Sequence, residues 1–430
     1  MRSASWAFVV LAVLLASHPG IAATGIEPHE SVQGVPEGPA EGEGGCQGVD
    51  AEGVRKAVDT YFRMKAHGCV TLCMPDLSLV MEPGDSRSYE EGRLSYSIEC
   101  WRETGVRHES FCYRPQYESI VFAEAGCAVL VRPVIWLRVA HGVGEYAIGT
   151  ELHRVSLFHT GDGWKVREDQ YVDDFTQTYP RGTDFQHLLV DLRSDLASVR
   201  ERDREIELRL ASDPRSDPDW APGNVGVMAT YVAYDRIRAA QYGMTYTNND
   251  GSLTSTTNYN TLFRAYNPSD CQNFVCQCIW YGFGGVNDYA HISGHLFPMI
   301  GDGPPLGTSS WWSDGSSTVY APGQTYDWPW VNVGDFFGIA YDQYLNNKIG
   351  VQAVQATSGT VYKGDYVATA TWSHVLIIVN CIDANSNRVY EYSEIWVSAH
   401  TANRQNVLLA SLYPSPSSVV FVRVVRYRDS

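Results

Sequence analysis

The stretch that decides the fold is Asp270-Cys271-Gln272-Asn273-Phe274-Val275-Cys276-Gln277-Cys278-Ile279. It predicts a helix that begins at Cys271, because Ser269 or Asp270 can cap the first turn. The free N–H groups and partial positive charge of a helix N-terminus favour a thiolate and can stabilise an oxyanion. At helical spacing, the apolar face of this helix holds Cys271, Phe274, Val275 and Cys278. The thiol is therefore expected to point toward a packed sheet.

The second informative stretch is Trp372-Ser373-His374-Val375-Leu376-Ile377-Ile378-Val379. The continuous apolar run after His374 predicts a strand that is buried on both faces. His374 stands at the end of this strand, where the predicted helix would hold Cys271 beside it. A thiol and an imidazole placed in this way are the two halves of a cysteine nucleophile site.

Two further groups are needed to complete such a site. A residue must orient the imidazole, and Asn403 is preferred because it follows a predicted strand closely; Asp383 and Asn385 are the alternatives. The Cys271 backbone N–H is one predicted donor to the oxyanion. An upstream side-chain donor is also expected, and the candidates are Gln241, Asn248 and Asn249.

The other cysteines offer a different interpretation. Cys271 shares its part of the chain with Cys276, Cys278 and Cys381, so it is either free, bridged or a buried structural thiol. Six more cysteines precede residue 130, and in an oxidising compartment they are predicted to form disulfides: Cys46, Cys69, Cys73, Cys100, Cys112 and Cys127. Their pairing is not readable from the sequence.

Metal and cofactor sites are not predicted. His67, Cys69 and Cys73 lack the second half of a zinc site. His291 and His295 have helical spacing but lack the Glu that follows the first His in zinc-binding helices.

Composition limits the classes of protein. The 430 residues are 44% hydrophobic, which suffices for packed cores in one to three domains. The formal net charge of −17 repels nucleic acid and anionic lipid, so neither is a predicted partner.

The first residues have the form of a secretory signal. Arg2 supplies positive charge, Trp6 to Ala16 an apolar run, and Gly20-Ile21-Ala22-Ala23 small residues for cleavage. Residues 1–23 are therefore predicted to be a signal peptide, and 24–49, rich in Gly, Pro and Glu, a flexible leader. The protein is expected to be secreted, with no membrane attachment after cleavage.

Residues 50–182 are predicted to form an α+β domain. A helix is followed by long strands, and Gly161-Asp162-Gly163 is a tight turn between the last two. This order resembles the cone-shaped α+β fold of the nuclear transport factor and SnoaL-like families. His153 and His159 share one strand face, where they either pack or act as acid–base groups in a cone pocket.

Residues 183–224 are predicted to be a long connecting helix and a linker. Apolar residues recur in steps of four and three from Phe185 to Leu210, interrupted by Asp203. Such a stripe packs along a domain or pairs two chains, so an oligomer through residues 185–210 is one option. Asp213-Pro214 and Asp217-Pro218 end the helix.

Residues 225–430 are predicted to form a second α+β domain, with helices before strands. Its loop from 305 to 330 is rich in tryptophan and either lines a substrate cleft or packs: Trp311, Trp312, Trp328 and Trp330.

The cysteine motif is specific enough to name a family. Asp270-Cys271-x-Asn273-Phe274-Val275-x-Gln277-Cys278 resembles the Asp-Cys-Thr-Asn-Phe-Val-Ser-Gln-Cys signature of the Putative amidase domain family, which is distantly similar to papain-like cysteine peptidases. Other stretches resemble family landmarks in the same order: the helix from Tyr231 to Ala240, Gly364-Asp365, Ser373-His374-Val375 and His400-Thr401-Ala402-Asn403. The resemblance spans residues 225 to 415.

This resemblance implies that Cys271 is the nucleophile and His374 the general base. It also implies a papain-like α+β fold for the C-terminal domain. The chain departs from the family at Cys276, where Ser is usual, and at Asn403, where Asp is usual.

Two functions follow as expectations. The first is a secreted cysteine amidase or peptidase that cleaves an amide bond through Cys271, His374 and Asn403, with cell-wall peptide as the first substrate to test. The second is a secreted, non-catalytic binding protein with bridged cysteines and a ligand pocket in the N-terminal domain.

Overall fold

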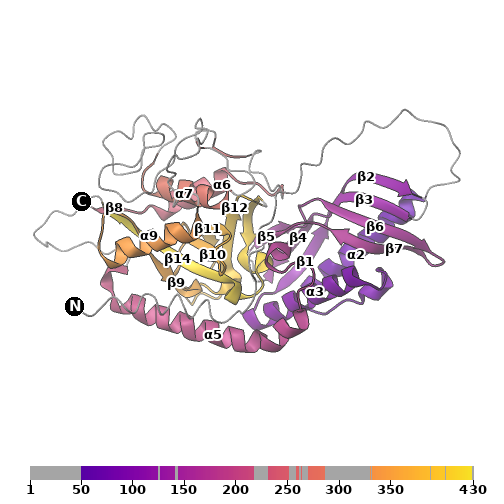
Figure 1. Cartoon of the computed structure of the whole chain (residues 1–430), viewed down its shortest axis with the longest axis horizontal. Coiled ribbons are helices and arrows are strands. Elements are labelled where there is room, and N and C mark those ends of the chain that lie inside the picture. The colour runs from indigo at the N-terminus through magenta and orange to yellow at the C-terminus, as the bar shows by residue number, and fades with distance from the viewer. Residues whose placement is uncertain are drawn as a thin grey trace, which may run out of the picture. The chain divides into compact units, whose positions relative to one another are not determined.

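The computed structural model describes residues 50–123, 126–140, 144–216, 231–250, 258–260, 263, 270–285, 330, 332–387, 389–401 and 403–428 (Figure 1). Asp50–Ser430 forms one compact unit. Several predicted features lie outside the described residues: the signal peptide (1–23), the leader (24–49) with Cys46, the linker residues 217–224, His291, His295, and Trp311, Trp312 and Trp328.

Two helices open the described chain. Helix α2 (Ala51–Thr71) begins where the Asp50 side chain accepts a hydrogen bond from the Gly53 N–H, and it buries Val54, Val58, Tyr61 and Phe62. After a short turn, η1 (Leu77–Leu79), comes α3 (Asp85–Thr104). The sequence did not predict α3, because its polar first half carries little apolar periodicity.

Seven strands follow in two antiparallel sheets. The order β1-β4-β5 joins His108–Tyr113, Ile135–Val139 and Gly144–Ile148. The order β2-β3-β6-β7 joins Gln116–Ala123, Gly126–Arg132, His153–Thr160 and Gly163–Gln170. The predicted hairpin at residues 161–163 is the β6–β7 turn. Two long predicted strands are each divided in two, so that their halves pair in different sheets. The likeness to the cone-shaped families stays a prediction.

A short helix and a long one lead out of this half. Helix α4 (Asp174–Thr178) has a capping box formed by Asp173 and Thr176. Helix α5 (Phe185–Ser212) is the predicted connecting helix, followed by η3 (Pro214–Ser216). The apolar stripe of α5 is buried within the chain. Leu192 and Leu196 pack near α3, while Ile206 and Leu210 pack beside β9 and β14. The observed packing is along the chain's own domains; pairing of two chains stays untested.

The C-terminal half contains a seven-stranded antiparallel sheet with helices laid on it. The strand order is β13-β12-β11-β10-β14-β8, and β9 also pairs with β14. The strands are β8 (Tyr231–Ala233), β9 (Gly350–Ala356), β10 (Tyr366–Thr369), β11 (Val375–Cys381), β12 (Ile395–Ala399), β13 (Arg404–Leu408) and β14 (Val419–Arg428).

Helices α6 (Arg236–Thr245) and α7 (Cys271–Gly282) pack against β11, and α9 (Val333–Leu345) packs against β9 (Figure 1). Shorter helical turns are η5 (Ser358–Thr360), η6 (Tyr392–Glu394), α10 (Leu409–Leu412) and η7 (Pro416–Ser418). The helix predicted from Tyr231 starts later, because Asp235 caps α6 and the residues before it form β8.

Strand β11 is buried on both faces, as predicted. Val375 and Ile377 join the core under α7, whereas Leu376 and Ile378 join the core shared with the N-terminal half. Trp101 of α3 adds a direct link, because its Nε1–H donates to the Ala410 carbonyl of α10 at 2.7 Å. The described residues therefore form an α+β fold in which one sheet separates two cores.

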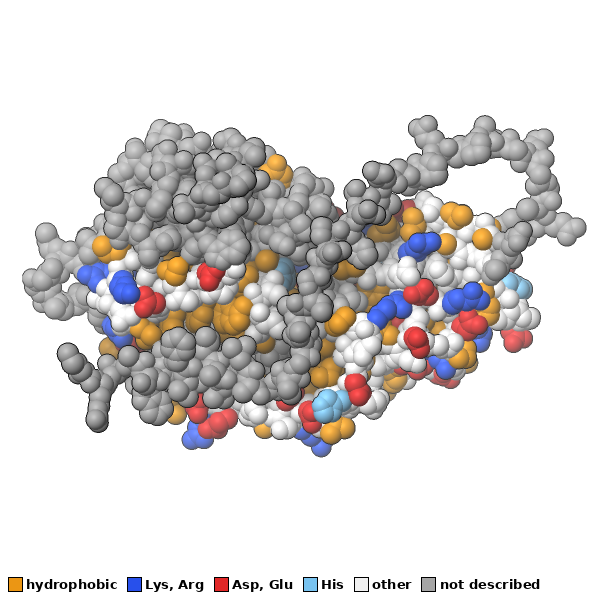
Figure 2. All heavy atoms as spheres, in the orientation of Figure 1, with side chains coloured by type: hydrophobic (Ala, Val, Ile, Leu, Met, Phe, Trp, Pro, Cys, Tyr) orange, Lys and Arg blue, Asp and Glu red, His pale blue; other side chains and the backbone are white. Residues whose placement is uncertain are grey.

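The Gly364-Asp365 pair fixes the position of β11. Gly364 has φ +91°, and a Cβ there would lie 2.5 Å from the Arg236 carbonyl oxygen, so only glycine fits. Asp365 is fully buried, and its carboxylate accepts hydrogen bonds from the N–H groups of Tyr362 and Val424 at 2.9 and 3.0 Å. Charged side chains of both signs are interspersed over the described part of the face drawn in Figure 2.

Candidate active site

Cys271 is the first residue of α7, as the sequence predicted. It is 6% exposed and carries a free thiol. The helix is buried on nearly every side, with Phe274, Val275 and Cys278 fully enclosed. Cys271 therefore lies at a helix N-terminus inside the fold, where backbone N–H groups are available to a developing oxyanion.

A network around Asp270 holds this helix terminus. Asp270 Oδ2 lies 2.6 Å from Nδ1 of His400, and its Oδ1 accepts a hydrogen bond from Asn273 Nδ2 at 2.7 Å. The Asp270 N–H donates to Thr401 Oγ1 at 3.0 Å. The residue before Cys271 is thus fixed by the loop after β12.

His400 has a structural place in this network. It is 1% exposed, its ring stacks on Phe274 at 4.0 Å between centroids, and its Nε2 lies 2.6 Å from the Tyr246 carbonyl oxygen. Both ring nitrogens are occupied within the fold, so neither is open to a substrate. In the sequence, His400 belongs to a stretch that resembles a family landmark, but nothing there predicts this structural role.

His374 comes directly before β11, the strand against which α7 packs. Its backbone is fixed by Thr369, whose N–H donates to the His374 carbonyl at 2.9 Å. The side chain is 12% exposed, and its Nε2 is buried without a hydrogen bond among the described residues. This nitrogen lies 3.6 Å from Oδ1 of Asp174.

Cys271 and His374 share a neighbourhood. Burial raises the pKa of the Tyr413 phenol, and the nearby Asp174 and Cys271 add to the shift. Asp174, which His374 faces, and Cys271 therefore both lie near the Tyr413 phenol. Within the described part of the chain, no hydrogen bond joins the Cys271 thiol to the His374 ring.

Asp174 is the residue that the sequence analysis missed. It belongs to α4 and is 4% exposed, and its Oδ2 lies 3.3 Å from Nε of Arg404, the first residue of β13. Burial raises the pKa of Asp174 to about 6, although Arg404 opposes the shift. In the sequence, Asp173-Asp174 resembles an ordinary acidic helix start, and nothing marks its approach to His374.

The side-chain amide of Asn403 bonds to the loop after α6. It is fully buried, and its Nδ2 donates to Asn248 Oδ1 at 2.7 Å and to Asp250 Oδ1 at 3.2 Å. Among the described contacts, none joins Asn403 to the His374 ring. The amide instead ties the start of β13 to the loop after α6.

The alternative orienting residues lie at the far end of β11. His374 precedes this strand and Asp383 follows it, so the length of β11 alone, at about 3.3 Å per residue, places them roughly 20 Å or more apart. Asn385 donates to Glu391 Oε1 at 2.8 Å in the same distant loop.

The candidate oxyanion donors are also engaged or turned away. Asn249 exchanges hydrogen bonds with Gln405, Asn248 bonds Asn403, and Gln241 is exposed. The backbone N–H of Cys271 stays the predicted donor.

The nine described cysteines are all unbridged. The disulfides predicted for Cys69, Cys73, Cys100, Cys112 and Cys127 are therefore not formed in this structure. Cys69, Cys100 and Cys127 instead pack as small apolar side chains, and burial raises the pKa of their thiols to about 11, 12 and 11. Burial likewise raises the pKa of Cys381 to about 12.

Two other expectations concern metals and membranes. Across the ranges that the structure describes, no three His, Cys, Asp or Glu side chains are grouped to hold a metal ion. No helix in those ranges has the length and apolar character needed to cross a bilayer.

Comparison with known proteins identifies the C-terminal half. Residues 233–422 match the model of the family described as Putative amidase domain. No curated protein matches the chain. A solved structure, the intermembrane space region of chloroplast protein ARC6, has 14% identity and a TM-score of 0.23, covering 29% of this chain and 98% of that one.

Proposed function

We propose that the chain, whose residues 233–422 form a domain of the Putative amidase family, hydrolyses an amide bond with Cys271 as nucleophile and His374 as general base. The observation that carries this proposal is the placement of a free thiol at the N-terminus of α7, packed on the strand that His374 precedes.

The chemistry is acyl transfer. His374 takes the proton of the Cys271 thiol, and the resulting thiolate attacks the amide carbonyl while backbone N–H groups at the start of α7 stabilise the oxyanion. His374 then donates a proton to the nitrogen, the C–N bond breaks, and an amine leaves behind a thioester on Cys271. His374 next takes a proton from water, which attacks the thioester and releases the carboxylic acid.

Asp174 is the third group of this site. Its carboxylate faces Nε2 of His374 at 3.6 Å, which leaves Nδ1 for the proton transfers. An ionised Asp174 orients the ring and stabilises the imidazolium that forms during the reaction. The role first expected for Asn403 is therefore given to a residue from the other half of the chain.

The substrate and the place of action extend the proposal. The sequence of residues 1–23 favours export, and an exported amidase meets cell-wall peptides first. The rival function, a binding protein with bridged cysteines, finds less support because Cys271 is unbridged.

The test is hydrolysis of a set of muropeptides and peptide amides by the exported protein, with products identified by mass spectrometry. Wild type should release new amine and carboxylate ends, while Cys271→Ala and His374→Ala should not. Activity that persists in Cys271→Ala would reject the thiol mechanism. Cys73→Ser is the matched control, because Cys73 is exposed and far along the sequence from the site.

A further inference from the structure

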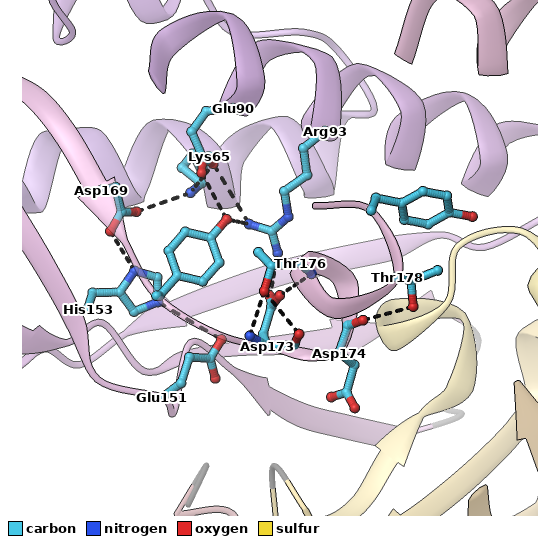
Figure 3. A network of polar contacts seen from close by, with 12 residues as sticks. Lys65, Glu90, Arg93, Glu151, His153, Asp169, Asp173, Asp174, Thr176 and Thr178 are labelled. Atoms are coloured by element: carbon cyan, nitrogen blue, oxygen red, sulfur yellow. Dashed lines mark hydrogen bonds and ion pairs between the residues drawn. The ribbon is translucent and has the colours of Figure 1, made fainter. Parts of the chain in front are cut away.

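A cavity of about 100 Å³ lies mainly in the N-terminal half and shares one lining residue, Asp174, with the proposed active site. Its walls come from α2, α3, the strands β4 to β6 and the start of α4, and residues Arg404, Ser411 and Leu412 close one side. Neither Cys271 nor His374 lines it. Figure 3 shows the polar side chains that meet there.

A histidine in the wall of this cavity has a ring nitrogen without a hydrogen bond among the described residues. His153 Nδ1 lies 2.8 Å from Oδ1 of Asp169. Although burial alone would raise it, His153 and Lys65 hold the pKa of Asp169 below its usual value, so this carboxylate accepts the proton-bearing Nδ1. His153 Nε2 is buried and has no hydrogen bond among the described residues. In the neutral ring that nitrogen is an acceptor.

The imidazole is held rigidly in this orientation. The Tyr171 ring stacks on it at 4.2 Å between centroids, and Phe62 meets it edge-on at 5.2 Å. Tyr61 adds a hydrogen bond to the other oxygen of Asp169 at 3.0 Å. The arrangement is thus organised in advance of any ligand.

A carboxylate oxygen stands opposite the open nitrogen. Glu151 Oε1 lies 3.9 Å from His153 Nε2, too far for a hydrogen bond (Figure 3). The second oxygen of Glu151 is paired with Arg404 at 3.3 Å. Two acceptors therefore face one another across a gap that a single donor group with two N–H bonds can bridge.

The cations of the wall are already paired. Lys65 Nζ lies 2.7 Å from Glu90 Oε2, and Arg93 Nη2 lies 2.8 Å from Asp173 Oδ2. Arg404 is shared between Glu151 and Asp174. Among the described residues, the two atoms that remain without a hydrogen-bond donor, His153 Nε2 and Glu151 Oε1, are acceptors. The negative charge of the carboxylates disfavours an anionic ligand.

The rest of the lining is apolar and favours a short hydrocarbon beside the donor group: Leu94, Ile135, Ile148 and Leu412.

We propose that this cavity binds a small primary amine, whose nitrogen bridges His153 Nε2 and Glu151 Oε1 while its hydrocarbon part lies on the apolar wall. This site shares Asp174 with the proposed hydrolytic centre, but the two groups that would contact the amine, His153 and Glu151, are not part of that centre.

The test is isothermal titration of the whole secreted chain with n-butylamine, and with 1-butanol as the analogue of similar shape. Saturable one-to-one binding of the amine is expected, with the alcohol at least about tenfold weaker. His153→Asn keeps a donor near Asp169 but removes the Nε2 acceptor, so affinity for the amine should fall about tenfold or more. His159→Asn is the matched control, since His159 is exposed on the same strand, and its binding should equal wild type.

Other outcomes decide against the site. Absence of saturable heat with wild type means that the cavity holds water only, and equal binding by His153→Asn also overturns the proposal. If His153→Asn fails to fold, the titrations are repeated with Glu151→Gln. This variant should bind n-butylamine no more tightly than 1-butanol, and a preserved preference for the amine rejects the site. Cys271→Ala should bind n-butylamine as wild type does, which separates this result from any failure of the amidase proposal.

Discussion

Asp174 Oδ1 lies 3.6 Å from His374 Nε2, and the same carboxylate is held by Arg404 through its other oxygen. A helix start in the N-terminal half thereby contributes a carboxylate to the site that we propose, whose other members come from the C-terminal half. The N-terminal half accordingly has a direct part in the chemistry that we propose.

Replacing Asp174 by Asn tests this part. The amide keeps the size of the side chain but cannot stabilise an imidazolium, so kcat should fall about 100-fold with little change in KM. The pH profile of kcat gives a second measure. The wild-type rate should rise through about pH 6, where Asp174 ionises, and the rate of the variant should not show this rise. An unchanged profile would assign Asp174 a structural role only. Asn403→Ala should not alter the profile.

Asp173 and Asp174 should give opposite pH dependences of stability. The folded-state pKa of Asp174 is raised to about 6 by burial, so its contribution to the free energy of unfolding is present below about pH 4 and is lost as pH rises through about 6. Burial also acts on Asp173, but Arg93 and Thr176 bring its pKa below the usual value. Its contribution is present at neutral pH and is lost as pH falls.

Urea unfolding of Asp173→Asn and Asp174→Asn across the acid range measures this contrast. Relative to wild type, Asp173→Asn should lose most stability at neutral pH, whereas Asp174→Asn should lose least there. Parallel curves for the two variants would contradict the assigned environments.

Cys271 should be the thiol that reacts first with iodoacetamide at about pH 6, where ordinary thiols are largely protonated. The buried Cys69 and Cys100 and the partly buried Cys381 should stay unlabelled, because burial raises their pKa values. Peptide mapping by mass spectrometry, without reduction, checks both statements. His374→Ala should slow the labelling of Cys271, and equal rates would argue against an interaction between the two side chains.

Removing the buried His400 should destabilise the protein. His400→Phe preserves the stack on Phe274 but leaves Asp270 without its imidazole partner, at a cost of about 3 kcal/mol in the free energy of unfolding. His187→Phe is the control, since that ring is exposed and should change stability by less than about 0.5 kcal/mol. Thermal unfolding measures both.

Helix α5 offers a matched pair of aspartate substitutions. Leu192 is 3% exposed and packs in the aromatic cluster beside α3, whereas Val190 is 80% exposed. Leu192→Asp should lower stability by about 3 kcal/mol or more, and Val190→Asp by less than about 0.5. Sedimentation of the wild type and of Val190→Asp tests pairing of two chains; a mass that falls only in Val190→Asp would indicate an interface on the exposed face.

Much of the architecture was readable from local patterns. The helix that starts at Cys271, the doubly buried strand after His374 and the long stripe of α5 all follow from periodicity and capping, which act over a few residues. Helix α3 and strands β9 and β13 were not predicted, because their sequences have weak periodicity and their positions are set by packing. The start of β8 was mistaken for helix for the same reason.

The sequence by itself determined which thiol and which imidazole to consider, because the signals for a helix terminus and for an apolar strand each lie within a few consecutive residues. Only the tertiary structure decided that Asp174 faces His374, that Asn403 bonds to Asn248, and that His153 Nε2 lies 3.9 Å from Glu151 without a hydrogen bond among the described residues. These relationships join segments distant along the chain, and their energies depend on burial and distance, which no local pattern of residues records.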